Sequence, residues 1–284
     1  MQEIIKKADI LIEALPYIRA FRGKPVIVKY GGSVMGNEPI LKGILEDLVF
    51  MSYVGLRPVL VHGGGPEINQ RLKHLGRRAE FVDGMRVTDA DTIRVVDDSL
   101  TDLNKALVHK LKGLGGAAVG MTPATHGVIK ARPHANAERL GFVGVVAEVD
   151  TATLDRLLQQ GAIPVVSPVG VGPGKQRYNI NADDAASQVA SALRAEKLVL
   201  LTDVQGIQRT VGESESLITT LTVGEAKGLI ERQVIQAGMI PKVQACVHAL
   251  RAGVRKTHII NAKTPHALLL EIFTTQGIGT EIVK

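Results

Sequence analysis

The sequence is poor in residues that several classes of protein require. It has one cysteine, Cys246, no tryptophan, and only 3% aromatic residues. A single cysteine excludes internal disulfides and cysteine-rich zinc sites. So few aromatic side chains argue against a protein that binds nucleic acid by base stacking. Cys246 lies in a segment with a helical pattern, where we expect a buried and inert thiol.

Long apolar runs and targeting segments are absent as well. No stretch of about 18 uncharged apolar residues occurs, so no membrane span is expected. The N-terminal residues alternate charged and apolar side chains, unlike a signal peptide, and we expect a cytoplasmic protein. The net charge of +6 comes from 34 basic and 28 acidic residues without a basic run. This distribution suits small anionic ligands and gives no nucleic-acid footprint.

Short apolar runs and helical patterns alternate along most of the chain. Runs of Val, Ile and Leu between helices indicate parallel strands buried on both faces. The predicted fold is therefore α/β, with a mainly parallel central sheet. GVIKAR and GFVGVVAEVD are predicted as an antiparallel pair. The strands of the parallel sheet are predicted in PVIVK, RPVLVH, AIPVVSPVG, KLVLLTDV and KTHIIN.

The first 22 residues are predicted as a helical arm. Apolar residues spaced by four and three form a narrow stripe, which favours a helix with one apolar face. The helix either packs on its own core or packs on another subunit. Pro16 is predicted to kink the helix or to end its first part. The stripe consists of Ile4, Ala8, Leu11, Leu15 and Ile18.

A lobe boundary is predicted near residue 170. The segment GVGPGKQ, residues 170–176, is rich in Gly and Pro and is predicted as a loop. We expect an N-terminal lobe over residues 23–170 and a C-terminal lobe over residues 171–284.

Two glycine clusters follow predicted strands, in KYGG at 29–32 and HGGG at 62–65. Glycine lets the backbone approach an anion, and helix N-termini supply N–H donors. Lys29 adds a positive charge at one strand end. One such cluster would be only a tight turn, whereas two in successive strand–helix units favour a phosphate cradle. The standard nucleotide-binding motifs do not occur. His62 is interpreted as a loop residue.

The second half carries polar residues at strand ends and helix starts. Asn179, Asn181 and Asp183 in YNINAD exceed what one helix cap requires. Asp203 ends a predicted buried strand, where it would contact a nucleoside. Lys242 follows a predicted helix start, where the dipole disfavours cations. A lysine there is predicted to bind an anion.

Together these segments resemble the acetylglutamate kinases of the amino-acid kinase family. The resemblance covers almost the whole chain and rests on an ordered set of motifs. It implies a three-layer αβα sandwich whose N-terminal lobe binds the amino acid and whose C-terminal lobe binds ATP. It also implies phosphorylation of the side-chain carboxylate of N-acetyl-L-glutamate by Mg-ATP, the second step of arginine biosynthesis. The motifs are VIVKYGG, VHGGGP, DGMRVTD, YNINAD, LTDVQG, GMIPK and LLLEIFTTQGIGT.

The resemblance assigns roles to individual residues. Lys29 and Lys242 would neutralise the transferring phosphoryl group, Asp183 would hold both lysines, and the Gly32 and Gly64 N–H groups would bind phosphoryl oxygens. Mg²⁺ would be held through the ATP phosphates, without protein ligands. The remaining contacts would come from Gly64, Gly65, Arg86 and Asn179 for the substrate, and from Lys29, Thr202, Asp203 and Lys242 for the nucleotide.

The arm and the C-terminal segment resemble one subclass of the family. In that subclass an extra N-terminal helix accompanies hexamers, built as trimers of dimers, and feedback inhibition by L-arginine. Glu271 would bind the guanidinium of arginine, with the Gly277–Gly279 turn beside it. The alternative is that Glu271 is only a charge at the end of a helix.

The chain also departs from the family pattern. MTPATHG at 121–127 and NAK at 261–263 stand where the family has other residues. These departures leave a kinase of another amino-acid carboxylate open as an alternative. A non-catalytic regulatory subunit of the same fold is the second alternative. Intact Lys29, Asp183 and Lys242 argue against it.

Overall fold

The computed structural model describes residues 1–210, 212–274 and 277–284; within these ranges it leaves out the side chains at positions 3, 4, 6–8, 33, 214 and 237. Two members of the predicted N-terminal stripe, Ile4 and Ala8, therefore lie outside the described side chains. Residues 275–276 of the C-terminal motif also lie outside the described residues.

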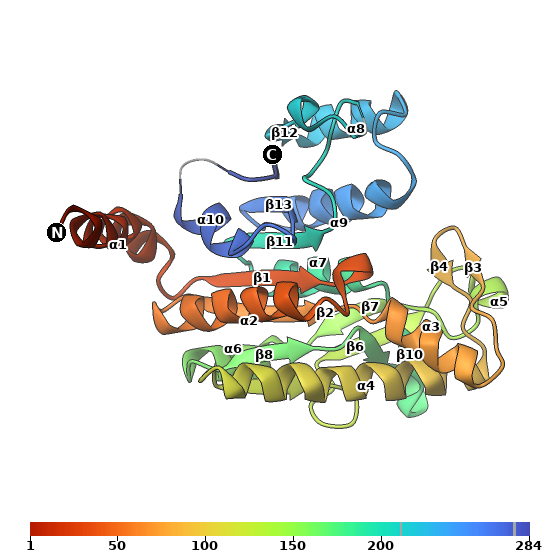
Figure 1. Cartoon of the computed structure of the whole chain (residues 1–284). Coiled ribbons are helices and arrows are strands. Elements are labelled where there is room, and N and C mark those ends of the chain that lie inside the picture. The colour runs from red at the N-terminus through yellow and green to blue at the C-terminus, as the bar shows by residue number, and fades with distance from the viewer. Residues whose placement is uncertain (211, 275–276) are drawn as a thin grey trace.

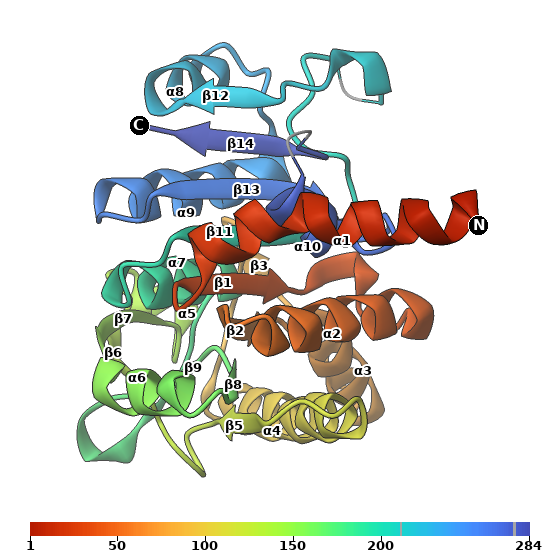
Figure 2. The ribbon, with the colours of Figure 1, turned by 90° about the vertical axis from the view of Figure 1, so that its left-hand side faces the viewer.

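One eight-stranded sheet forms the centre of the molecule (Figures 1 and 2). Neighbouring strands from β13 to β5 are parallel, whereas β14 is antiparallel to β13. This confirms the predicted mainly parallel sheet. In sheet order the strands are β12 (Thr220–Thr222), β14 (Thr280–Val283), β13 (Lys256–Asn261), β11 (Lys197–Thr202), β1 (Pro25–Tyr30), β2 (Arg57–His62), β8 (Ile163–Val166) and β5 (Ala118–Met121).

Helices cover both faces of this sheet (Figure 1). One face packs against α6 (Thr151–Gln159), α7 (Ala182–Ala192), α8 (Val223–Glu231) and α9 (Ile240–Arg251). The other face packs against α2 (Glu38–Tyr53), α4 (Ala90–Gly113) and α10 (Ala267–Phe273). The helix α3 (Gly65–His74) packs beside α4. The predicted αβα sandwich is therefore confirmed.

The strands are apolar throughout because both of their faces are buried. Successive side chains of a strand point to opposite faces. Ile27 accordingly packs toward α7 and α9, whereas Val26 and Val28 pack toward α2 and α4. A polar residue at the end of such a strand is therefore directed to one known layer of helices.

A smaller sheet follows the order β10-β9-β6-β7. Its strands β6 and β7 are antiparallel, which confirms the predicted pair. The predicted loop at 170–176 forms the end of β9 and the turn before β10. The bounds are β6 (Ile129–Pro133), β7 (Gly144–Val149), β9 (Val169–Val171) and β10 (Arg177–Asn179); α5 (Ala137–Leu140) lies between β6 and β7, and a separate hairpin consists of β3 (Phe81–Val82) and β4 (Met85–Arg86).

The N-terminal helix α1 (Gln2–Phe21) stands out from one end of the sheet (Figure 1). It runs through Pro16 without interruption, so the predicted end at that proline is wrong. Tyr17, Ile18 and Phe21 in its last turns pack against the core. Farther along the arm, Ile10, Leu11 and Ile12 are 63–67% exposed. The helix therefore extends away from its own core.

Among the described residues, no helix is both long and apolar enough to cross a membrane. Cys246 is a buried free thiol on α9, as predicted, and burial raises its pKa to about 12.

Candidate active site

One carboxylate lies between two lysines at the carboxyl edge of the sheet. Lys29 Nζ is 2.8 Å from Asp183 Oδ1, and Lys242 Nζ is 3.0 Å from Asp183 Oδ2. Lys29 has the same parity in β1 as Ile27, so it points to the face covered by α7 and α9. Those helices carry Asp183 and Lys242 in their first turns. The fold thus joins three residues that are far apart in the sequence.

This group, called the Lys–Asp–Lys triad below, is well shielded from water. Lys29 and Asp183 are each 5% exposed. Burial by itself raises the pKa of Asp183, but the charges of Lys29 and Lys242 outweigh burial and lower it overall. The carboxylate is therefore ionised at neutral pH, and the two lysines leave a net positive charge for an anionic ligand.

The two glycine clusters contact each other beside the triad. The Gly63 N–H donates to the Tyr30 carbonyl at 2.7 Å. A Cβ added to Gly31 would lie 3.2 Å from Gly63 Cα, so larger side chains would push the loops apart. Gly64 is the N-cap residue of α3, and its N–H has no acceptor among the described residues. The pair of loops thus offers backbone donors to an anion.

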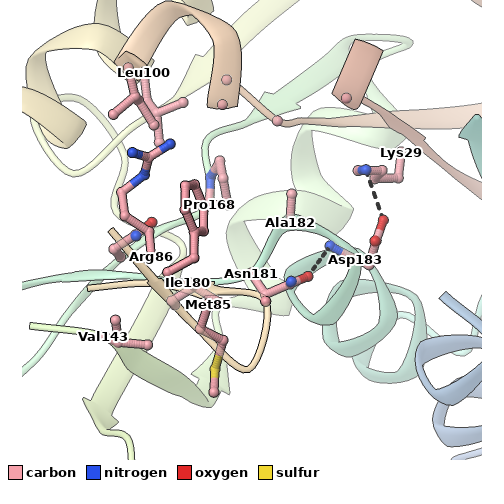
Figure 3. A pocket seen from close by; sticks show the side chains of 18 residues that line it. Lys29, Met85, Arg86, Leu100, Val143, Pro168, Ile180, Asn181, Ala182 and Asp183 are labelled. Carbon is pink, nitrogen blue, oxygen red and sulfur yellow. Dashed lines mark hydrogen bonds and ion pairs between the residues drawn. The ribbon is translucent and has the colours of Figure 1, made fainter. Parts of the chain in front are cut away.

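A cavity of about 340 Å³ lies against these loops and the triad. We call it the first cavity. Figure 3 shows Arg86 on one side of it and the Lys29–Asp183 pair on the other. The predicted site residues Gly32, Gly64, Gly65 and Asn179 also line it. The structure therefore brings all predicted substrate contacts to one cavity with a cation at each end.

Arg86 is held in place but not fully satisfied. One of its guanidinium nitrogens, Nη2, donates to Asn69 Oδ1 at 2.7 Å, and the guanidinium carbon lies 4.8 Å from the centre of the Phe81 ring. Its other terminal nitrogen, Nη1, is buried without a hydrogen-bond partner among the described residues. Burial lowers the pKa of Arg86. A carboxylate in the cavity would satisfy this donor.

The asparagines of YNINAD have separate functions. Asn181 caps α7, because its side-chain oxygen accepts from the Asp183 N–H at 2.8 Å. Asn179 donates to Thr88 Oγ1 at 3.2 Å and lines the first cavity. The segment therefore caps α7 and also lines the first cavity from residue 179 to residue 183.

A second cavity, of about 440 Å³, lies beyond Lys242. The predicted nucleotide contacts Thr202, Asp203 and Lys242 line it, together with Gly238 and Met239. Lys29 and Asp183 line the first cavity, so the triad stands where the two cavities approach each other. Two ligands bound in them would meet at the triad.

A third cavity, of about 730 Å³, lies between the end of α1 and the C-terminal part of the sheet. Glu271, Gly277 and Gly279 line it with Tyr17 and Phe21 of α1. Glu271 is buried; His258 Nδ1 lies 2.8 Å from its Oε1, and the Ile278 N–H donates to its Oε2 at 3.0 Å. Glu271 is thus not an exposed charge at a helix end.

His62 was predicted as a loop residue, and this is wrong. It ends β2 and is fully buried, on the side of the sheet that faces α4. The sequence analysis also missed Asn69 and Phe81, which hold Arg86. Their pairing depends on α3 meeting the β3–β4 hairpin, which no local pattern indicates.

Mg²⁺ is implied by the predicted chemistry, and the residues at the triad set how it could be bound. Both oxygens of Asp183 are engaged by lysines. Within the described ranges, no group of three His, Cys, Asp or Glu side chains could hold a metal ion. This donor set suits an ion that is held mainly by phosphate oxygens and water.

Comparisons with known proteins show which proteins this chain is similar to. The amino acid kinase family matches residues 24–261. Acetylglutamate kinase of Desulforamulus reducens is 48% identical, over 99% of this chain and 98% of that protein. Acetylglutamate kinase of Symbiobacterium thermophilum is 46% identical, over 100% of this chain and 99% of that protein. These matches confirm the predicted enzyme class, a phosphotransferase with a carboxyl group as acceptor.

Solved structures show the same fold. N-acetylglutamate synthase from Neisseria gonorrhoeae, complexed with coenzyme A and N-acetylglutamate, has a TM-score of 0.87 and 30% identity over 98% of this chain. This chain spans 63% of that synthase chain. Carbamate kinase from Giardia lamblia bound to AMP-PNP has a TM-score of 0.68 at 17% identity, over 92% of this chain and 99% of that chain, which shows the fold alone. The chain belongs to the amino acid kinase family.

Proposed function

We propose that this chain transfers the γ-phosphoryl group of ATP to the side-chain carboxylate of N-acetyl-L-glutamate. The observation that carries the proposal is the Lys–Asp–Lys triad, whose Lys29 and Asp183 line the first cavity and whose Lys242 lines the second. The same reaction is named in relatives that match almost the whole chain at 46–48% identity. The product would be an acyl phosphate, formed in the second step of arginine biosynthesis.

The first cavity suits a molecule with two carboxylates. The buried Nη1 donor of Arg86 would bind the α-carboxylate, and Asn179 would contact the rest of the substrate. The side-chain carboxylate would then reach the Lys29 end of the cavity, which lies opposite Arg86 in Figure 3. A planar guanidinium suits a carboxylate better than an ammonium group does.

The second cavity would hold the nucleotide. Thr202 and Asp203 end β11 at the carboxyl edge of the sheet, where ligands of α/β folds bind. Lys242 would bind the phosphates from this side. In this assignment, the lobe at residues 23–170 binds the acetylated amino acid, with an added contact from Asn179, and the lobe at residues 171–284 binds the nucleotide.

The proposed mechanism needs no general base. A glutamate side chain has a pKa of about 4.3, so the attacking carboxylate is already ionised at neutral pH. Lys29, Lys242 and the Gly32 and Gly64 N–H groups would bring two anions together and neutralise the charge that develops on the phosphoryl oxygens. Mg²⁺ bound to the nucleotide phosphates supplies further charge neutralisation.

We also propose that the third cavity binds L-arginine as a feedback inhibitor. Glu271 would bind the guanidinium, beside Gly277 and Gly279. An N-acetylglutamate synthase that resembles this chain, with a TM-score of 0.84 and 28% identity, is known in complex with L-arginine. The cavity includes α1 residues, so a ligand there would bias the position of the arm.

The exposed arm is proposed to join subunits into a hexamer built as a trimer of dimers. Its apolar side chains near Leu11 are exposed in the single chain, and contact with another subunit would bury them. Removal of residues 1–20 should reduce the assembly to a dimer, measured by light scattering after size-exclusion chromatography. A truncated protein that remains hexameric would refute this role.

The test of the proposed activity is hydroxylamine trapping of the acyl phosphate. Purified protein is incubated with Mg-ATP and N-acetyl-L-glutamate, with and without L-arginine. A hydroxamate signal that depends on acetylglutamate supports the activity, and suppression by arginine supports the effector site. A signal with free glutamate or aspartate instead would favour another amino-acid carboxylate. No signal with any carboxylate would favour a regulatory subunit.

Two substitutions test the triad in the same assay. Lys29→Ala and Lys242→Ala should each lose most of kcat, because each removes one of the two charges that would face the phosphoryl group. Lys263→Ala is a matched control, since Lys263 is an exposed lysine away from both cavities. Near-normal turnover of either triad variant would contradict the assignment.

A further inference from the structure

His62 is a buried histidine that the proposed mechanism does not use. It is 0% exposed and makes two short contacts. Its Nδ1 lies 2.7 Å from the Gly63 carbonyl oxygen, and its Nε2 lies 3.0 Å from Asn104 Nδ2. Asn104 Nδ2 also donates to the Val165 carbonyl at 2.8 Å. This network joins β2, α4 and β8 directly behind the glycine loop.

The hydrogen bonds fix one tautomer of His62. The Val165 carbonyl can only accept, so the amide nitrogen of Asn104 is the donor in that bond. The same amide nitrogen then donates to Nε2 of His62, which must carry no proton. The Gly63 carbonyl can also only accept, so Nδ1 of His62 carries the proton and donates to it. Burial lowers the pKa of His62 to about 4, which keeps the ring neutral.

The packing leaves little freedom to this network. A Cβ added to Gly120 would lie 2.4 Å from Asn104 Oδ1, so the glycine of β5 makes room for the amide. Asn104 itself is 1% exposed. The side chain that selects the tautomer of His62 is therefore held from both sides.

Both backbone polar groups of Gly63, its N–H and its carbonyl, form hydrogen bonds. Its N–H donates to the Tyr30 carbonyl at 2.7 Å, and its carbonyl accepts from His62. The peptide bond between Gly63 and Gly64 is planar and trans, so its carbonyl and its N–H point in opposite directions. A carbonyl that is fixed toward His62 therefore turns the Gly64 N–H away from His62. Gly64 lines the first cavity, and its N–H has no acceptor in the described part of the chain.

We propose that His62 is a positioning residue, whose Nδ1–H orients the Gly63–Gly64 peptide so that the Gly64 N–H points at the transferring phosphoryl group. The inference rests on the proposed phosphoryl transfer and adds a residue to it. Preorganised backbone donors stabilise developing charge because they need not reorient during the reaction. A free peptide group would have to reorient in each turnover.

Two substitutions separate this role from simple packing. In His62→Asn, the amide group stands at the same distance along the side chain as Nδ1, so it can still donate to the Gly63 carbonyl. In His62→Gln, the amide stands where Nε2 was, so it keeps the contact with Asn104 and loses the bond to Gly63. Both variants replace the same buried ring by an amide, so similar losses of stability are expected.

The experiment compares kcat, KM and urea unfolding for the wild-type protein and both variants in the hydroxamate assay. We expect His62→Gln to lose kcat by about 100-fold or more, with a smaller change in KM, as for other lost oxyanion donors. His62→Asn should keep most of kcat. Equal losses of kcat in both variants, or losses that follow stability alone, would overturn the proposal.

A second measurement needs neither turnover nor the correct acceptor. Tetrafluoroaluminate mimics a transferring phosphoryl group, so it should tighten the binding of Mg-ADP to the wild-type protein and to His62→Asn, but not to His62→Gln. Absence of tightening in the wild type, or equal tightening in both variants, would overturn the role of His62. Failure of acetylglutamate alone as a substrate would instead refute the proposed function. If His62→Gln does not fold, Asn104→Ser takes its place and should lower kcat by releasing the tautomer; unchanged kcat would count against the proposal.

Discussion

Replacement of Asp183 by asparagine is the most direct test of the triad. The change keeps the shape of the side chain and removes one negative charge from between two lysines. Asparagine can accept from one lysine through its oxygen, but its NH₂ group would face the other lysine as a second donor. Lys29 and Lys242 would then repel each other, and water would screen this repulsion only weakly because their side chains are only 7% and 21% exposed.

The structure sets the size of the effect. Removal of one partner from a buried ion pair costs about 3–5 kcal/mol, because the remaining charge stays buried and unpaired. If most of this loss appears in the transition state, kcat falls by roughly 100- to 1000-fold, at about 1.4 kcal/mol for each factor of ten. The KM for ATP should not rise, because two uncompensated cations still attract the phosphates.

The assay is initial-rate kinetics in ATP and acetylglutamate, together with urea unfolding. Asp184→Asn is the matched control, because Asp184 is the next residue on the same helix turn and is exposed. We expect a large loss of kcat and of stability in Asp183→Asn and a small effect in the control. A kcat within about twofold of the wild type, well under 1 kcal/mol, would reduce Asp183 to a charge at the start of α7.

Three further changes give separate expectations. Arg86→Lys should raise the KM for acetylglutamate by about 10- to 100-fold, with a smaller change in kcat. The reason is that a lysine cannot form a bidentate pair with a carboxylate, and a charged hydrogen bond contributes about 1.5–3 kcal/mol. An unchanged KM in initial-rate kinetics would contradict this expectation. Gly64→Ala should destabilise the protein by about 1–3 kcal/mol in urea, because the new Cβ would lie 2.2 Å from Leu100 Cδ2, whereas Gly65→Ala meets no atom within 4 Å and should not. The pKa of His62 is about 4 in the folded protein and 6.5 in the unfolded chain. As the pH falls, the unfolded chain therefore takes up the proton before the folded protein does. Stability should therefore fall as the pH drops from about 6.5 to 4, by at most about 3 kcal/mol, and His62→Asn should lack this part of the loss in paired urea titrations.

Sequence patterns predicted the central strands and the charged residues at the strand ends and helix starts, because these depend on neighbouring residues. The Val, Ile and Leu runs predicted the central strands because both faces of those strands are buried. Lys29 was singled out as a charge at the end of such a run, and Lys242 as a cation where the helix dipole opposes one. The resemblance then joined them through Asp183, and the structure places all three in contact.

Long-range pairing explains what the sequence did not indicate. The partner of His62 is Asn104, and the partner of Arg86 is Asn69; neither pair follows a fixed spacing. The four-stranded sheet combines strands from 129 to 179 in an order that no single strand reveals. Pro16 was expected to kink α1 or to end its first part, and the helix does not end there.

The position of β1 has a consequence for how the chain folds during synthesis. This strand is the first to be made, yet it lies inside the sheet, between β2 and β11. Val26 pairs with Lys197, so one edge of β1 has no partner until β11 is translated, roughly 170 residues later. At about 5–20 residues per second, this edge stays unpaired for roughly 10–30 s. We therefore expect the nascent chain to depend on protection from aggregation through most of its translation, and the finished sheet to close only when β11 leaves the ribosome.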